Sequence, residues 1–194
     1  MGHREYDASL RRDHARWLRL VTRFYRMVTV RLLDFQDAER FKSLRLFAVD
    51  DSPTSIWPTR HEEMARSAEE IAARILPTST QAVFRAFDGG VLVGITGVRR
   101  ESLRQVNHKA TIWGVFVSPS YRGRGIAQTL LSAATTHAAK EWDTIQLMLC
   151  VNAENLSVKK LYESHGFQTF GVEPRAMKVG DRFYDEEHMC KPLL

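Results

Sequence analysis

A short stretch near the middle of the chain combines residue types that can bind a phosphate group. It runs Val115-Phe-Val-Ser-Pro-Ser-Tyr-Arg-Gly-Arg-Gly-Ile-Ala127, from an apolar run through a turn into helical spacing. The first turn of a helix leaves backbone N–H groups unpaired at the positive end of the helix dipole. Gly123 and Gly125 remove side chains that would block close approach, and Arg122 and Arg124 add positive charge. The stretch therefore predicts an anion-binding turn suited to a pyrophosphate, although either arginine is also explained as a solvated loop residue.

Two common phosphate ligands do not fit this turn. A nucleoside triphosphate loop ends in Gly-Lys-Ser/Thr, whereas this turn ends in Gly125-Ile126-Ala127. The dinucleotide fingerprint needs Gly or Ala at position 128, which is Gln128 here, and an acidic residue about 20 positions further on at a strand end. Without either signature, the turn on its own is also compatible with a plain helix start.

The same residues resemble the GNAT superfamily of N-acetyltransferases. Its hallmark, Arg/Gln-x-x-Gly-x-Gly/Ala, is matched by residues 122–127, and its Val-x-Pro-x-Tyr-Arg-Gly lead-in by residues 117–123. The resemblance implies that the turn holds the pyrophosphate of coenzyme A, with acetyl-CoA as co-substrate and no metal ion. It also implies that the preceding strand carries a bulge and splays from its neighbour, which frees backbone groups at Phe116 and Val117 for the pantetheine arm.

A second, independent match covers residues 151–167. The family pattern is Val-x-Ala-x-Asn-x-x-Ala-x-x-Leu-Tyr-x-x-x-Gly-Phe, and this chain departs from it only at Val158, a packing position. Asn155 is a good helix N-cap and Gly166 a good helix stop, so both also have a structural explanation. The resemblance adds a cofactor contact for Asn155. The cofactor-binding residues that the two matches imply are Phe116, Val117, Arg122, Gly123, Arg124, Gly125, Ile126, Ala127 and Asn155.

Tyr162 is the residue to which the resemblance gives a chemical role. A lone tyrosine on a helix is usually a packing residue with a solvated hydroxyl, and its neighbour Leu161 is expected to share a core stripe with Leu156 and His165. In the family the matching tyrosine lies beside the thioester sulfur and protonates the leaving thiolate. The implied reaction is direct attack of a neutral primary amine on the thioester carbonyl. Backbone N–H groups of the splayed strand would stabilise the oxyanion, and Tyr162 would be the general acid.

The base that deprotonates the amine is not identified by the sequence. Many relatives place a glutamate on the strand before the turn, but residues 110–114 read Ala-Thr-Ile-Trp-Gly and hold no carboxylate. Glu62, Glu63, His108, Glu173 or a water chain are the candidates, and each side chain alone is better explained as a surface residue. The missing carboxylate keeps a second hypothesis open, a regulatory module of the same fold that binds coenzyme A without transfer.

Beyond residue 167 the chain resembles a narrower bacterial GNAT subgroup. The subgroup has a Gly-x-Glu-Pro-Arg-Ala-x-Lys segment, found here at residues 171–178, and its acceptor is mostly undetermined. Glu173 and Arg175 follow the strand that should border the acceptor pocket, although an ion pair that fixes the last hairpin explains them as well. The expected partner is an amine on a small molecule, a peptide or a protein, and a homodimer stays open.

The elements that must position these residues describe one mixed α/β domain. In the second predicted helix, Met64, Ala68, Ile71 and Ile75 are expected to face inward. The fold class is therefore α/β, a single GNAT-type domain whose mixed central β-sheet splays at the cofactor site and is flanked by helices. Periodicity and turn residues predict strands at 28–33, 81–87, 91–99, 109–117, 144–151, 167–172 and 184–192, and helices at 34–49, 62–76, 125–140 and 156–165.

Composition and charge argue against other classes of protein. The 194 residues suffice for one core, and no apolar run approaches the roughly 20 residues of a membrane helix. The net charge is +5, but residues 1–26 hold seven of the 28 basic and three of the 23 acidic residues, which leaves +1 for the remainder. A nucleic-acid-binding domain spreads positive charge over its folded body, so neither nucleic acid nor membrane is an expected partner. Cys150 and Cys190 lack metal-ligand spacing and are expected to be reduced thiols in a cytoplasmic protein.

The first 26 residues differ from the rest in composition. They are rich in arginine, contain no lysine and carry apolar residues at helical spacing. The expected organisation is a basic, helical N-terminal extension over residues 1–26 and an N-acetyltransferase domain over residues 27–194. A helix over residues 8–25 is expected to lay Trp17, Val21 and Phe24 against protein surface.

Overall fold

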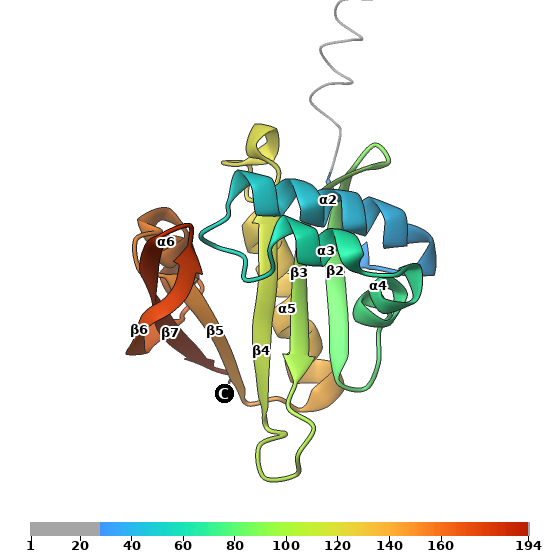
Figure 1. The fold of residues 1–194 in the computed structure, drawn as a ribbon. Helices are drawn as coiled ribbons and strands as arrows, with labels where there is room; N and C mark the ends of the chain where they lie inside the picture. Colours follow the sequence, from blue (N-terminus) through green and yellow to red (C-terminus); the bar gives the residue numbers. More distant parts are fainter. Residues whose placement is uncertain (1–27, 194) are drawn as a thin grey trace, which may run out of the picture.

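The computed structural model describes residues 28–193. The expected helix over residues 8–25 lies outside these residues. Within them, one seven-stranded sheet has the order β1-β2-β3-β4-β5-β7-β6 (Figure 1). All neighbouring strands are antiparallel except β4 and β5, which are parallel. The prediction of a single α/β domain with a mixed central sheet is confirmed.

The strands and helices have the following bounds. The strands are β1 (Thr29–Leu32), β2 (Gln81–Asp88), β3 (Val91–Arg100), β4 (Lys109–Val117), β5 (Gln146–Asn152), β6 (Gln168–Val179) and β7 (Arg182–Pro192). The helices are α2 (Ala38–Asp51), α3 (Arg60–Ala65), α4 (Ala68–Ile75), α5 (Ile126–Trp142) and α6 (Leu156–Ser164). Two short 3₁₀ turns precede α2 and α5, at η1 (Phe35–Asp37) and η2 (Pro119–Tyr121).

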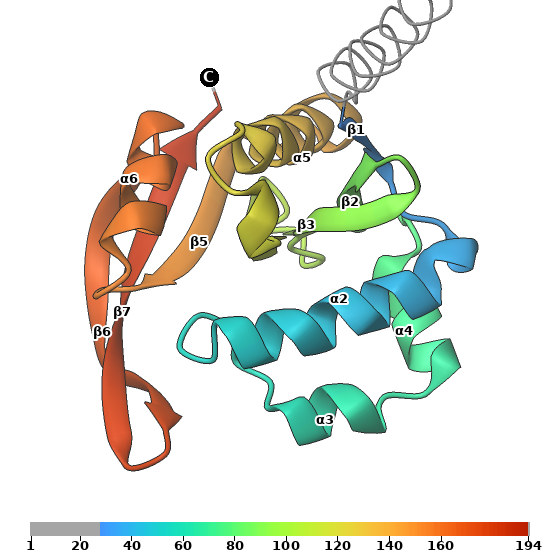
Figure 2. The ribbon, with the colours of Figure 1, turned by 90° about the horizontal axis from the view of Figure 1, so that it is seen from above.

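Helices cover both faces of the sheet, with α5 on one face and α2, α3 and α4 on the other (Figure 2). The apolar stripe of α5 explains its position, because Leu130, Ala134 and Ala138 are completely buried at a spacing of four residues. They share a core with side chains of α6, including Tyr162. A second core lies under α2 and α4, and the β4 residue Phe116 belongs to it.

The single helix predicted over residues 62–76 is wrong, because the segment forms the two helices α3 and α4. Arg66 and Ser67 have extended backbone angles, and Ser67 then caps α4 by accepting a hydrogen bond from the backbone N–H of Glu70. The break changes which side chains face inward. Ile71 is buried as expected, but Met64 is exposed and the neighbouring carboxylate of Glu63 is buried instead.

The last hairpin is longer than the sequence predicts. The strand expected at residues 167–172 extends to Val179 as β6, and its register against β7 shifts twice on the way. Pro174 lies within β6, where the missing backbone N–H is tolerated because β6 is the edge strand of the sheet. Arg175 adopts a positive φ of 56° next to it. These irregularities hide the strand from a pattern search.

Candidate active site

Strands β4 and β5 separate in the middle of the sheet, as the V between them in Figure 1 shows. Their parallel pairing covers only Lys109 to Thr111 on β4, opposite Gln146 to Met148 on β5. Beyond Thr111, β4 pairs only with β3 among the strands of residues 28–193. A bulge lies in this part, where Gly114 has a φ of 62° and the register between β3 and β4 shifts. The outer edge of β4 therefore faces an opening rather than a strand.

The glycine turn follows directly at the end of β4. Gly123 and Gly125 have φ angles of 73° and 75°, a conformation that side chains with a Cβ rarely adopt. Gly125 is the N-cap of the 17-residue helix α5 and offers no side chain to cap it. The first amide groups of α5 are thus left for an external anion, and the space that a Cβ of Gly123 would meet is open. This local geometry fits the pyrophosphate of coenzyme A.

The two arginines of the turn lie in different surroundings. Arg122 donates from Nε to the Val117 carbonyl at 3.0 Å and forms an ion pair with Asp51 at 2.5 Å, at the end of α2. Partial burial alone would raise the pKa of Asp51, but hydrogen bonds from Arg122 and Ser52 outweigh this and lower it. Arg124 instead donates to the Ser120 carbonyl and lies over the Tyr121 ring.

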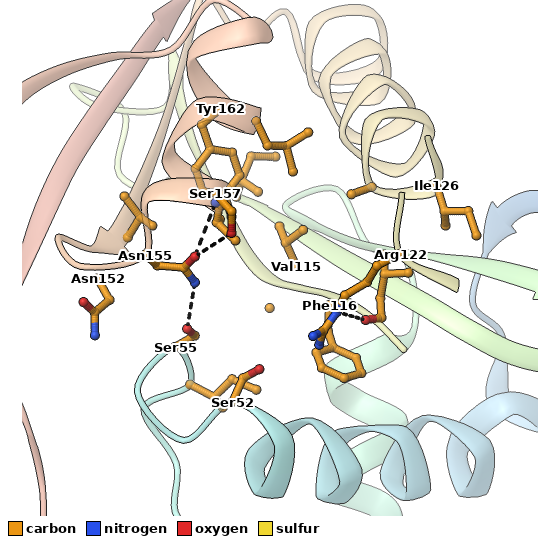
Figure 3. A pocket seen from close by; sticks show the side chains of 18 of the residues that line it. Ser52, Ser55, Val115, Phe116, Arg122, Ile126, Asn152, Asn155, Ser157 and Tyr162 are labelled. Atoms are coloured by element: carbon orange, nitrogen blue, oxygen red, sulfur yellow. Dashed lines mark hydrogen bonds between the residues drawn. The ribbon is translucent and has the colours of Figure 1, made fainter. Parts of the chain in front are cut away.

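A pocket of about 550 Å³ connects the glycine turn with the opening between β4 and β5. Eight of the nine predicted cofactor-binding residues line it, and Arg124 does not. Figure 3 shows Phe116, Arg122 and Ile126 on one side of this pocket, and Asn155 and Tyr162 on the other. The predicted residues that line the pocket are Phe116, Val117, Arg122, Gly123, Gly125, Ile126, Ala127 and Asn155.

Asn155 positions helix α6 at the pocket. Its side chain accepts a hydrogen bond from the backbone N–H of Val158 at 3.3 Å, which caps the helix as the sequence predicts. The expected core stripe of α6 is wrong at Leu156, which is exposed, whereas Leu161 is half-buried and packs against the core and the pocket. The buried residue of this helix is Tyr162.

Tyr162 combines deep burial with a place in the pocket wall. Its side chain is 6% exposed, and its ring packs edge-on against Phe167 with centroids 6.0 Å apart. Burial, and to a smaller extent the nearby Cys150, raise the pKa of the phenol far above its ordinary value of 10.0. The hydroxyl is therefore a neutral donor at any physiological pH, as a general acid must be before it acts.

Cys150 lies on β5 and also lines the pocket. Burial, the carboxylate of Glu186 and, to a smaller extent, that of Glu173 together raise the pKa of its thiol to about 12. A thiol in this state is a poor nucleophile. Cys150 is therefore poorly suited to act as a nucleophile.

None of the four side chains predicted as candidate bases belongs to the pocket wall in the described part of the chain. Glu62 caps α3 through Thr59. Glu63 is buried in an ion-pair network with Arg45, away from the pocket wall. His108 precedes β4, at the opposite end of that strand from the glycine turn. Glu173 contacts His188 at 3.0 Å across the last hairpin.

Two parts of the pocket were missed by the sequence interpretation. One is Glu186 on β7, a buried carboxylate in the pocket wall. The other is the loop between α2 and α3, which the sequence shows only as a Pro- and Ser-containing connection. Three hydrogen bonds tie this loop to the β5–β7 side: Asn152 Nδ2 to the Thr54 carbonyl at 2.9 Å, Asn155 Nδ2 to Ser55 Oγ at 3.3 Å, and Trp57 Nε1 to Glu186 Oε1 at 2.9 Å.

The alternation of β7 was the available signal for Glu186. Residues two apart on a strand share a face, so Tyr184, Glu186 and His188 are separated from Asp185 and Glu187. The sequence does not say which of these two faces meets the pocket, because that depends on pairing with β5. Residue 186 lies opposite Asn152 in that pairing.

Comparison with known proteins places the chain in a family. A model of the acetyltransferase (GNAT) family matches residues 43–167. The N-alpha-acetyltransferase RimI of Mycobacterium tuberculosis is 31% identical over 154 residues, which cover 78% of this chain and 85% of that protein. A sheet that opens beside a glycine turn is the arrangement expected of an acyl-CoA-binding fold, and the chain belongs to the GNAT acetyltransferase family.

One further relative matches a smaller part of the chain, and a solved structure shares its fold. An L-2,4-diaminobutyric acid acetyltransferase of Streptomyces anulatus is 26% identical over 116 residues, 59% of this chain and 64% of that protein. A GNAT acetyltransferase from Streptococcus pneumoniae has the same fold, with a TM-score of 0.78 at 21% identity over 87% of this chain and all of the other. The chain thus spans less than two thirds of the length of the diaminobutyrate enzyme.

Two further features concern residues 28–193 only. No group of three or more His, Cys, Asp and Glu side chains there is arranged to hold a metal ion. None of the helices there combines the length and the apolar character that crossing a bilayer requires.

Proposed function

We propose that the protein transfers the acetyl group of acetyl-CoA to a primary amine by direct attack, with Tyr162 as the general acid. The observation that carries this proposal is one pocket with an uncapped helix N-terminus at one end and a buried, neutral phenol in its wall. An anion cradle suits the phosphates of coenzyme A. A phenol at the other end suits the departing sulfur.

In this proposal three elements of the pocket wall, α5, β4 and α6, bind different parts of the cofactor. The N-terminal turn of α5, with Gly123, Gly125, Ile126 and Ala127, holds the pyrophosphate together with Arg122. The free edge of β4 at Phe116 and Val117 provides backbone groups for the pantetheine arm, and Asn155 contacts the cofactor from α6. Arg124 then acts indirectly, because its guanidinium supports the turn through Ser120.

The names of two relatives support an amine as acceptor. RimI of Mycobacterium tuberculosis is named for acetylation of an alpha-amine, and the Streptomyces anulatus enzyme for acetylation of diaminobutyric acid. A structure of yncA from Salmonella typhimurium, described with acetyl-CoA as its cofactor, matches with a TM-score of 0.73 at 20% identity over 87% of this chain and 95% of the other. We therefore include acetyl-CoA and an amine in the proposal.

Coenzyme A release over a panel of amines tests the proposal. The panel holds small diamines, amino acids, peptides with a free N-terminus and lysine-containing peptides, each incubated with acetyl-CoA and the full chain. Release above the no-amine rate, with acetylated product in the mass spectrum, is the expected result. Tight binding of coenzyme A by calorimetry without release for any amine would instead favour the regulatory module that binds coenzyme A without transfer.

A further inference from the structure

The pocket wall carries two charged side chains among the described residues, and they have opposite signs. Arg122 lies beside the glycine turn, and Glu186 lies on β7. The positive side chain lies where a phosphate is expected. The negative one lies on the far side of the opening between β4 and β5, beyond the strand that carries Cys150. The end of the pocket away from the phosphate cradle is therefore suited to a cation.

The carboxylate of Glu186 is held in place and only half satisfied. It is 4% exposed, and its Oε1 accepts a hydrogen bond from Trp57 Nε1 at 2.9 Å. No hydrogen bond from a nitrogen or oxygen donor within residues 28–193 reaches its Oε2, and the neighbouring donor to this carboxylate is the weak S–H group of Cys150. A buried carboxylate oxygen without a strong hydrogen-bond donor is unfavourable and is rare in folded proteins. An oxygen in this state is ready to accept a hydrogen bond from a ligand.

Strand pairing places Glu186 on the same sheet face as Cys150, a neighbour of the proposed general acid. It lies opposite Asn152 on β5, on the sheet face that also carries Cys150. The thiol of Cys150 interacts with the Glu186 carboxylate and also with the phenol of Tyr162. One small side chain therefore lies close to both groups. This brings a carboxylate and a phenol to the same part of the pocket, where the acetyl group is expected.

We propose that Glu186 binds the ammonium group of the acceptor and accepts its proton. This inference rests on the proposed acetyl transfer and names the base that transfer requires. One proton passes from R–NH₃⁺ to a carboxylate oxygen of Glu186, and the nitrogen lone pair attacks the thioester carbon. The C–N bond forms and the C–S bond breaks, while Tyr162 gives its proton to the sulfur. The phenolate recovers a proton from the nitrogen, and Glu186 releases its own to solvent.

Neighbouring groups on β6 and β7 fit this role less well. Glu173 and His188 share the same sheet face, but they contact each other at 3.0 Å, and the Glu173 side chain is more than half exposed. Glu187 points to the opposite face, where it pairs with Lys159 at 2.7 Å and accepts from Thr169 at 2.6 Å. Glu186 alone among these combines burial, a place in the pocket wall and a carboxylate oxygen without a strong donor.

The acceptor class follows from this assignment. An alkyl primary amine has an ordinary pKa of about 10 and arrives as an ammonium ion at neutral pH. A carboxylate inside a poorly solvated pocket attracts such a cation and repels an acceptor with a second carboxylate close to the amine. We therefore expect the protein to prefer acceptors in which any second charged group is far from the reacting amine or is itself positive.

The experiment compares Glu186→Gln with the wild-type full chain on two acceptors of similar shape. One is an alkylamine that the wild type acetylates, and the other is the matching alkoxyamine, which is already neutral at pH 7. The variant should lose about 100-fold or more in kcat/KM with the alkylamine, since general base catalysis contributes 10²–10⁴-fold. It should lose less than about 5-fold with the alkoxyamine, which needs no base before attack. Acetyl-CoA affinity should stay within about threefold of the wild type.

The matched control is Glu187→Gln, which removes the adjacent carboxylate from the other face of β7. This variant should keep the wild-type ratio of kcat/KM between the two acceptors, even if loss of the ion pair with Lys159 lowers its melting temperature. Wild-type turnover of the alkylamine by Glu186→Gln, or an equal loss on both acceptors, would overturn the assignment of Glu186. A wild-type chain that releases no coenzyme A with any amine would overturn the proposed acetyl transfer itself, which is a different result.

Discussion

At the scale of single residues, the pocket keeps its proton donor neutral and holds a guanidinium beside the glycine turn. Tyr162 is buried, so its phenol cannot ionise readily and retains the proton that a leaving thiolate needs. Arg122 is half-exposed and pairs with Asp51. A phosphate must compete with that carboxylate for the guanidinium, and the ion pair keeps Arg122 close to the turn before the ligand binds.

The phenol can be tested by Tyr162→Phe, which removes one hydroxyl and keeps the ring against Phe167. We expect kcat to fall by about 10²-fold or more, because general acid catalysis contributes 10²–10⁴-fold. Acetyl-CoA affinity measured by calorimetry should change little. Wild-type turnover under conditions where chemistry limits the rate would assign Tyr162 to packing alone.

The thiol of Cys150 gives a prediction that needs no activity. Its pKa is raised from an ordinary value of 9.0 to about 12, so at pH 8 its thiolate fraction is about a thousandfold below that of an ordinary cysteine. Iodoacetamide should therefore label Cys150 very slowly in the native protein at pH 8 and quickly after unfolding in urea, as followed by peptide mass mapping. Rapid native labelling of Cys150 would contradict this description of the pocket.

At the scale of elements, the glycine turn depends on backbone conformation as well as on charge. Gly125 has a φ of 75°, and a Cβ there would lie 3.3 Å from Gln128 Oε1. Gly125→Ala tests strain and crowding, and Gly125→Asp adds a carboxylate beside the expected pyrophosphate. Coenzyme A affinity of the Asp variant should be at least tenfold weaker than that of the Ala variant, about 1.4 kcal/mol. Equal affinities by calorimetry would show that the phosphates do not lie at this turn.

The buried ion pair between α2 and α3 stabilises the wall behind β4. Burial alone would raise the pKa of Glu63, but Arg45 and Arg74 outweigh it and lower the pKa below its ordinary 4.5. Arg45 itself is completely buried and lies near Gly114 of the bulge. Removing one partner of such a pair typically costs about 3–5 kcal/mol, because the other charge stays buried.

We therefore expect Glu63→Gln to lower the free energy of unfolding by about 3 kcal/mol at pH 7 in urea titrations. Because the folded-state pKa is depressed, this contribution is present above pH 4.5 and is lost as pH falls through the folded-state pKa. The difference between wild type and variant should therefore shrink in acid. Glu62→Gln is the control, since a glutamine still completes the capping box, and its stability should stay close to wild type. A difference that does not depend on pH would assign the effect to packing.

The elements themselves were largely predictable, and the failures have local causes. The Asp88-Gly89-Gly90 turn fixed the β2–β3 hairpin, since both glycines adopt a positive φ. The α3–α4 break was hidden because Ser67, a helix start, interrupts a run of good helix formers. The length of β6 was hidden by Pro174, which a pattern search reads as a strand end although an edge strand accepts it.

At the scale of the whole molecule, the pocket lies where the parallel β4–β5 pair stops and the sheet divides. Residues from both parts of the divided sheet meet in this pocket. Part of the site could be predicted from the sequence, and part could not. The cradle at 122–127 and the segment 151–167 are local, and their match to two family sequence patterns was enough to predict them. Glu186 and Trp57 reach the pocket through long-range pairing and loop packing, which no local pattern encodes.

The whole molecule also sets the last prediction, that residues 1–26 are dispensable for the fold and the chemistry. Residues 28–193 supply the seven strands, both cores and every residue of the pocket wall described above. A chain of residues 27–194 should therefore fold and keep coenzyme A release within a few-fold of the full chain. This shorter chain should also elute from a polyanion column at a lower salt concentration than the full chain, because the segment removed carries +4 of the +5 net charge. Loss of soluble, folded protein on this deletion would show that the N-terminal segment belongs to the core.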